Sequence, residues 1–306
     1  MQPVIRANHL TKHFNHVTAV DDLSFTVNEG EVYGFLGQNG AGKSTTIRML
    51  LTLVQPTKGS IEIFGHNLYA HRNEILRQIG AIIEKPDLYK YLSAYDNLSV
   101  FARLSGLRAS NKLLMEKLAM VGLAERAHSK VRTFSQGMKQ RLGIAVALVH
   151  DPRLIILDEP TNGLDPQGIA DIRKLIVHLS RDLGKTIFVS SHLLNEIEQV
   201  SDRLLILDKG RKVVEGSIHQ LVDPSNASME LKTSNDDACY NILKHAPEWS
   251  PFLGPRDNGH VMMKLPAEQV PLLVSFLVKE GIGIYSLRQQ NSLEAYFLSV
   301  ISGKAT

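Results

Sequence analysis

The stretch Gly37-Gln38-Asn39-Gly40-Ala41-Gly42-Lys43-Ser44-Thr45 decides the fold of this chain. Glycine, four residues and then Gly-Lys-Ser is the pattern of a loop that binds nucleotide phosphates. Its glycines let the backbone curl, so that successive N–H groups from Asn39 to Thr45 point at phosphate oxygens. We expect Lys43 to reach the β- and γ-phosphates, Ser44 to ligate Mg²⁺ and Thr45 to bond the α-phosphate.

The residues on either side have the order that a phosphate loop requires. Val32–Leu36 before the loop is predicted to be a short buried strand, and the apolar residues Ile47, Leu50, Leu51 and Val54 after it follow helical spacing. A helix starting there directs its positive N-terminal end at the bound anion. This order favours a phosphate site over a glycine-rich turn that only happens to contain Gly-Lys-Ser.

The composition is that of a globular protein with room for two domains. The chain has 306 residues, of which 43% are apolar and 21% charged, and its formal net charge of +3 gives no electrostatic case for nucleic acid as a partner. Cys239 is the single cysteine, so it cannot form an internal disulfide, and we expect it to pack in a reducing compartment. No apolar run has the length of a signal peptide core or a membrane span.

Short apolar runs predict a sheet, interrupted by a helical insertion. Residues 4–10 and 23–27 alternate as an antiparallel pair, and residues 60–64 and 79–83 are further strands. Leu154–Leu157 and residues 186–192 are apolar at successive positions, as in parallel strands buried on both faces. Helical spacing over residues 94–150 predicts an inserted helical subdomain.

Polar residues follow the apolar strands where each strand ends. The phosphate loop follows the first, Asp158 and Glu159 the second, and His192 the third. Ligands bind at the carboxyl edge of such sheets, so we expect these residues to converge on one phosphate site. Asp158 would hold Mg²⁺ through water, Glu159 would position the attacking water, and His192 would bond that water or the γ-phosphate. The predicted reaction is hydrolysis of a nucleoside triphosphate, because the paired carboxylates favour water over another phosphate acceptor.

Two further positions have more than one interpretation. Ser135 is predicted to cap a helix, and the same helix start, with Gly137 in its first turn, is also an anion site. Phe14 is either an aromatic residue that anchors a loop or one that stacks on adenine, and spacing alone does not decide between them.

These motifs together resemble the ATP-binding subunit of an ABC transporter over about residues 3–220. They occur in the family's order: the loop at 37–45, the signature Phe134-Ser135-Gln136-Gly137-Met138, the acidic strand, the loop Asn162-Gly163-Leu164-Asp165 and the switch residue His192. The resemblance implies an α/β P-loop NTPase fold with a mixed sheet core, an antiparallel β subdomain and the inserted helical subdomain. It makes Phe14 the residue that stacks on adenine.

The resemblance also implies partners. Two copies would face head to tail, each ATP lying between one copy's phosphate loop and the other's signature, so that Ser135 and Gly137 would complete the partner's site. Asp165 would also contact the nucleotide. A separate integral membrane permease would dock a cytoplasmic helix near residues 84–98. The chain would then be peripheral on the cytoplasmic face of the cell membrane.

The sequence departs from the family pattern in two places. Gln136 and Met138 replace the usual residues of the signature, and Glu84 stands where the family has a glutamine that ligates Mg²⁺. A carboxylate can still ligate Mg²⁺, although it adds negative charge near the γ-phosphate. The same departures are similar to the bacitracin and lantibiotic export subgroup, which implies a peptide antibiotic as the exported substrate.

The remaining residues predict a second domain, so that the domains are 1–222 and 223–306. Residues 229–231, 261–265 and 282–287 are strand candidates, and Asp236–His245, 268–279 and 291–300 are helix candidates. We expect a small α+β accessory domain that regulates the ATPase or supports its dimer, rather than a ligand sensor.

Two alternatives to a transporter subunit fit the sequence less well. A soluble ABC ATPase acting on ribosomes would have two fused cassettes, and one acting on DNA would have a long coiled coil before the signature; this chain has neither. A structural protein that binds nucleotide without hydrolysing it is opposed by the intact set of Lys43, Asp158, Glu159 and His192.

Overall fold

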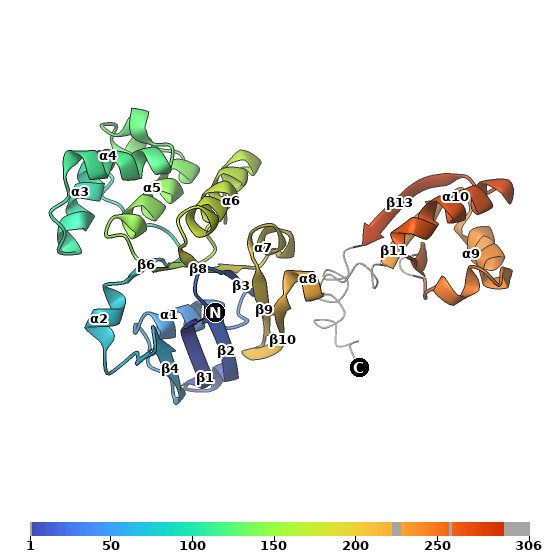
Figure 1. Ribbon diagram of the computed structural model, residues 1–306, viewed down its shortest axis with the longest axis horizontal. Helices are drawn as coiled ribbons and strands as arrows, with labels where there is room; N and C mark the ends of the chain where they lie inside the picture. The colour runs from blue at the N-terminus through green and yellow to red at the C-terminus, as the bar shows by residue number, and fades with distance from the viewer. Residues whose placement is uncertain (1, 222–227, 257–258, 291–306) are drawn as a thin grey trace. The chain divides into compact units, whose positions relative to one another are not determined.

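The computed structural model describes residues 2–221, 228–256 and 259–290 (Figure 1). It divides into two compact units, Met1–Gly216 and Ser217–Thr306, close to the boundary expected after residue 222. Within the described ranges, every helix is too short or too polar to cross a lipid bilayer.

A six-stranded sheet forms the centre of the first unit, with strand order β10-β9-β3-β8-β7-β6. Its strands are β3 (Val32–Leu36), β6 (Ile79–Ile82), β7 (Leu154–Leu157), β8 (Thr186–Ser191), β9 (Arg203–Asp208) and β10 (Arg211–Ser217). The neighbours from β9 to β6 pair in parallel. Strands β3, β7 and β8 are buried at every position, as their continuous apolar sequences predict. Their carboxyl ends therefore meet at one edge of the sheet.

A second sheet is antiparallel, with strand order β2-β1-β4-β5. It contains β1 (Pro3–Phe14), β2 (Val17–Asn28), β4 (Lys58–Ile63) and β5 (His66–Asn67). The predicted pairing of β1 with β2 is correct, but both strands are longer than expected, because the ladder continues until Phe14 lies opposite Val17. Asn15, at φ 44°, begins the tight turn that closes this hairpin.

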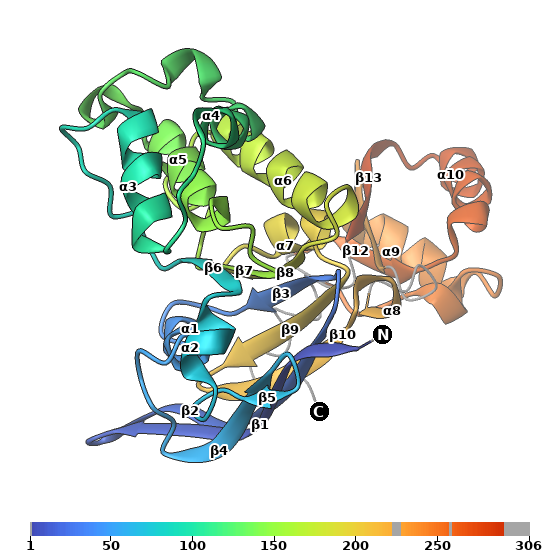
Figure 2. The same ribbon diagram turned by 60° about the vertical axis from the view of Figure 1, so that its left-hand side comes forward.

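The helices pack around the central sheet. They are α1 (Lys43–Leu50), α2 (Arg72–Leu76), α3 (Ala94–Leu104), α4 (Asn111–Met120), α5 (Gln136–Leu148), α6 (Pro166–Arg181) and α7 (Leu194–Val200). Helices α3, α4 and α5 gather on one side, away from strands β1, β2 and β4 (Figures 1 and 2). They form the helical insertion expected over residues 94–150. Helix α1 ends earlier than its apolar spacing predicts, although Leu51 and Val54 beyond its end still pack against the core.

Aromatic side chains join the two sheets. Phe25 from β2 lies 5.9 Å from the rings of both Tyr33 and Phe35 in β3, and 6.0 Å from that of Phe188 in β8, measured between ring centroids. All four side chains are buried. Such a cluster stabilises the fold through the large apolar area that it removes from water. It also fixes β3 and β8, the strands that lead into the phosphate loop and His192.

The second unit contains a three-stranded antiparallel sheet, in the order β12-β11-β13. Its described elements are α8 (Ile218–Leu221), β11 (Ser228–Thr233), α9 (Asp236–His245), β12 (Val261–Lys264), α10 (Val270–Lys279) and β13 (Ile284–Gln290). The core of this unit includes Cys239, Leu243 and Trp249. The helix predicted over 291–300 lies outside the described residues.

Candidate functional site

The phosphate loop connects β3 to α1, and its glycines are required by close contacts. Gly42, the N-cap of α1, has φ 108°, and a Cβ there would lie 2.4 Å from the carbonyl oxygen of Ala19. A Cβ on Gly37 would lie 2.6 Å from the carbonyl oxygen of Leu207. Gly40 has φ 83° and open space around it. Only glycine fits this backbone without strain or displacement of its neighbours.

A pocket of about 420 Å³ lies over this loop. It is lined by Val17, Thr18, Ala19, Gln38, Asn39, Gly40, Gly42, Lys43, Ser44, Thr45, Glu159 and Lys209. The polar backbone of the loop and the start of α1 give the pocket a positive end, which fits the phosphates of a nucleotide.

Lys43 is buried, with an exposed fraction of 5%. Its Nζ donates to the carbonyl oxygens of Gly37, at 2.6 Å, and of Gln38, at 3.3 Å. The same nitrogen lies 3.0 Å from Glu159 Oε1. The loop and the end of β7 thus hold one ammonium group between them.

Asp158 follows β7 and is almost completely buried. Its Oδ1 accepts a hydrogen bond of 2.6 Å from the Ser190 hydroxyl, whereas its Oδ2 has no hydrogen-bond partner among the described residues. A buried carboxylate oxygen without a donor is unusual in a protein interior. Asp158 and Ser44 line a pocket of about 630 Å³, and the oxygen ligands that they offer fit Mg²⁺.

Glu159 and His192 are in contact at the edge of the sheet. The distance between His192 Nδ1 and Glu159 Oε2 is 2.6 Å. Glu159 has φ 50°, a left-handed backbone conformation that is uncommon for glutamate and is held by its surroundings. Contacts therefore join Lys43, Glu159 and His192, which lie beyond the carboxyl ends of three separate strands, β3, β7 and β8.

Comparison with known proteins identifies the family. A family model described as ABC transporter matches residues 20–162. The chain is 43% identical to "Uncharacterized ABC transporter ATP-binding protein YhcH" of Bacillus subtilis (strain 168), over 98% of this chain and 96% of that protein. The chain belongs to the ATP-binding subunits of ABC transporters. Members of this family are ATPases.

Two relatives whose names state a transported substrate have a similar sequence identity to this chain. The chain is 41% identical to "Bacitracin transport ATP-binding protein BcrA" of Bacillus licheniformis, over 99% of both proteins. It is 42% identical to "Lantibiotic transport ATP-binding protein SrtF" of Streptococcus pyogenes, over 69% of this chain and 90% of that one. The resemblance to the bacitracin and lantibiotic subgroup is therefore confirmed at the level of sequence.

A solved structure confirms the expected α/β fold of an ABC ATPase. It is a dimeric structure of a post-hydrolysis state of the ATP-binding cassette MJ0796 bound to ADP and Pi. The TM-score is 0.63 at 26% identity, over 70% of this chain and 98% of that one.

Three of the predicted nucleotide-binding residues, Ser135, Gly137 and Asp165, do not line the phosphate-loop pocket. Ser135 is exposed and caps α5, its Oγ accepting from the Met138 N–H at 3.2 Å. A Cβ on Gly137 would have Ser135 Oγ as its nearest neighbour, at 4.0 Å. Asp165 caps α6, its Oδ1 accepting from the Gly168 N–H at 2.9 Å. The predicted cap at Ser135 is thus present, and the N-terminus of α5 is open.

Phe14 lies at the tip of the β1–β2 hairpin, with 45% of its surface exposed. Lys12 Nζ lies 4.9 Å from the centroid of its ring. Phe14 itself does not line the phosphate-loop pocket, but its ladder partner Val17 does. An exposed ring next to that pocket is compatible with stacking on a base.

Glu84 lies at the same pocket as Ser44 and Asp158, but its carboxylate has another partner. Its Oε1 accepts from Arg48 Nη2 at 2.7 Å, and its backbone has φ 59°. As a Mg²⁺ ligand, Glu84 would have to exchange the guanidinium of Arg48 for the metal.

Several residues of the site were not identified from the sequence. Lys209, in the turn after β9, adds a second lysine to the phosphate-loop pocket. Ser190 contacts both acidic residues at the end of β7. Glu196 is buried in α7, where its Oε2 accepts from the hydroxyls of Thr161 and Ser191. The only sequence signal for these residues is a polar side chain in or beside a buried apolar segment.

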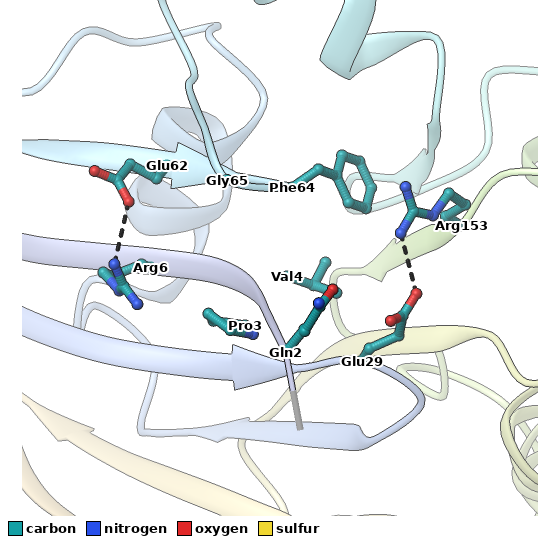
Figure 3. A pocket seen from close by; sticks show the side chains of 9 residues that line it. All are labelled: Gln2, Pro3, Val4, Arg6, Glu29, Glu62, Phe64, Gly65 and Arg153. Carbon is teal, nitrogen blue, oxygen red and sulfur yellow. Dashed lines mark hydrogen bonds and ion pairs between the residues drawn. The ribbon is translucent and has the colours of Figure 1, made fainter.

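A separate pocket of about 290 Å³ has no such arrangement (Figure 3). Its charged side chains pair with one another, Arg6 with Glu62 at 3.4 Å and Arg153 with Glu29 at 3.0 Å. The guanidinium of Arg153 also lies 4.6 Å from the ring centroid of Phe64. None of the motif residues lines this pocket.

Proposed function

We propose that this chain powers the export of a peptide antibiotic, such as bacitracin or a lantibiotic, through a separate membrane permease. One observation supports the ATPase site most strongly: Glu159 contacts both Lys43 and His192, next to Asp158, whose Oδ2 has no hydrogen-bond partner among the described residues. The substrate class is supported by the sequence identity to the bacitracin and lantibiotic transport relatives.

In this proposal the loop N–H groups and Lys43 bind the phosphates of ATP, and Ser44 and Asp158 hold Mg²⁺. Bound Mg²⁺ would neutralise charge on the β- and γ-phosphates. Glu159 positions the attacking water and accepts its proton, while His192 orients the Glu159 carboxylate through the 2.6 Å contact.

A second copy of the chain completes each site. Ser135 and Gly137, at the open start of α5, would donate N–H groups to the γ-phosphate bound by the partner, and Asp165 would lie beside that nucleotide. This part is supported by the exposure of Ser135 and by the dimeric form of the related cassette MJ0796.

The permease would contact the surface around residues 84–98, where Tyr89 and Tyr91 have exposed fractions of 51% and 81%. Exposed aromatic side chains are common at protein interfaces. This contact would place the chain at the cytoplasmic face of the membrane as a peripheral subunit. The domain after residue 222 would act as a regulatory or dimer-supporting module.

Glu159→Gln tests the hydrolytic part of the proposal. The amide keeps the shape of the side chain but cannot accept the proton of water, so we expect ATP binding to persist and turnover to fall by about 10² or more. Size-exclusion chromatography with ATP and Mg²⁺ should then show a stable dimer. Normal turnover by this variant would contradict the assigned role of Glu159.

Export is tested in cells that carry the chain together with its permease. Deletion of the gene should increase susceptibility to bacitracin or to a lantibiotic, and the wild-type gene should restore resistance, whereas the Glu159→Gln gene should not. Unchanged susceptibility to both compounds, with normal ATPase activity, would contradict the substrate class and leave the ATPase site intact.

A further inference from the structure

The Ser190 hydroxyl lies between the two acidic residues that follow β7. Ser190 is completely buried near the end of β8, one residue beyond the registered pair of Leu157 and Val189. Its Oγ donates to Asp158 Oδ1 at 2.6 Å and accepts from the backbone N–H of Glu159 at 2.9 Å. A hydroxyl has one hydrogen to donate, so these two bonds have fixed directions.

This arrangement determines which oxygen of Asp158 is available. The bond from Ser190 occupies Oδ1 and restricts rotation of the carboxylate, whereas Oδ2 stays buried without a partner among the residues described. The bond from the Glu159 N–H holds the backbone of Glu159, which has φ 50°. One side chain thus orients both the metal-binding carboxylate and the residue that positions water.

We propose that Ser190 is a positioning residue of the magnesium site, which presents Asp158 Oδ2 to the Mg²⁺–ATP complex and fixes the backbone of Glu159. This inference rests on the proposed binding of Mg²⁺ by Asp158. Residues that orient metal-binding side chains typically change metal affinity about 10- to 100-fold when they are substituted.

Ser190→Ala removes both bonds and should raise the Mg²⁺ concentration for half-maximal ATP hydrolysis about tenfold. A second measurement does not depend on turnover: the dissociation constant of a fluorescent ATP analogue, with Mg²⁺ and with EDTA. We expect the ratio of the dissociation constant in EDTA to that with Mg²⁺ to be smaller for Ser190→Ala than for wild type. The dissociation constant in EDTA itself should stay within about twofold of the wild-type value. Ser190→Thr keeps the hydroxyl and should restore both values.

Ser180→Ala is the matched control. Ser180 is also buried, and its Oγ donates to the carbonyl oxygen of Gly30 at 2.9 Å, outside the lining of either nucleotide-site pocket. It should lower the melting temperature without changing the Mg²⁺ dependence. If Ser190→Ala does not fold, Ser190→Cys serves in its place, because the thiol is a weaker donor that still fills the space.

Asp158→Asn distinguishes the proposed binding of Mg²⁺ by Asp158 from the proposed positioning role of Ser190. Should Asp158→Asn leave the Mg²⁺ dependence of analogue binding unchanged, the metal assignment itself is wrong. Should Asp158→Asn change that dependence while Ser190→Ala and Ser190→Cys match wild type, only the role of Ser190 is overturned. A Ser190→Ala variant that merely melts at lower temperature, like Ser180→Ala, would also overturn it.

Discussion

At the scale of single residues, the ammonium group of Lys43 is the centre of the site. It has three oxygen neighbours, two backbone carbonyls of its own loop and one carboxylate oxygen of Glu159. The spacing of the loop predicted that Lys43 faces phosphate. It did not predict the contact with Glu159, because that contact depends on how β3 and β7 are arranged in the sheet.

Lys43→Ala should weaken ATP binding by at least about tenfold, because it removes the charge that would pair with the β- and γ-phosphates. Equilibrium dialysis with ATP and Mg²⁺ measures the change. Lys117→Ala is a matched control, since Lys117 is also mostly buried and lies 3.8 Å from Asp151, in an ion pair outside the pocket linings. Equal affinities for Lys43→Ala and wild type would refute the assignment of residues 37–45 as the loop that binds the phosphates of ATP.

Glu84→Gln should alter the Mg²⁺ dependence of hydrolysis, or the coupling of hydrolysis to transport, more than ATP affinity. The substitution removes a negative charge at the pocket of Ser44 and Asp158 and breaks the ion pair with Arg48. Arg48→Gln breaks the same ion pair but keeps the Glu84 carboxylate. If the two variants behave alike, the ion pair is responsible; if neither differs from wild type, Glu84 has no role in the site.

At the scale of elements, the apolar strands could be predicted well and their polar contacts could not. Leu154–Leu157 is buried at all four positions, as its run of large apolar residues indicates. The roles of Ser190 and Glu196 depend instead on the register between β7 and β8 and on the packing of α7 against β8. Sequence patterns give the type and order of elements, but the contact of Ser190 with Asp158 joins residues 32 positions apart, and that of Glu196 with Thr161 joins residues 35 positions apart.

Helix α5 packs directly against the segment that carries Glu84. A Cβ built on Gly143 would lie 2.5 Å from Pro86 Cγ, so Gly143→Ala must displace either the helix or the proline. Overpacking of this kind typically costs about 1–3 kcal/mol, and we expect a lower melting temperature. In the same helix, a Cβ on Gly137 would come no closer than 4.0 Å to another side chain, the Ser135 hydroxyl, so Gly137→Ala should not lower the melting temperature. A Gly143→Ala variant as stable as wild type would show that the segment around Pro86 can move without a cost in stability.

At the scale of the whole molecule, two units have separate cores. The bacitracin relative matches 99% of the chain, whereas the solved cassette MJ0796 matches 70%. The bacitracin match therefore includes almost all of the second unit. The motifs predicted the first unit in detail, because ATP chemistry requires particular residues at fixed spacings. For the small core of the second unit, the sequence offers only the periodic spacing of apolar residues.

The single thiol reports on the second unit. Burial raises the pKa of Cys239 to about 11, so its thiolate at pH 8 is about a hundredfold scarcer than for a thiol with an unshifted pKa. We expect iodoacetamide at pH 8 to modify the native protein very slowly and the unfolded protein rapidly, as followed by mass spectrometry. Rapid modification of native protein would contradict the burial of this side chain.

Lys43 Nζ lies 3.0 Å from Glu159 Oε1, so under the proposed function ATP would replace Glu159 as the partner of this lysine. In that exchange the triphosphate oxygens would take over the Lys43 ammonium group, and Glu159 would lose its counter-charge. The binding of ATP would thus free the carboxylate that is proposed to accept the proton of the attacking water.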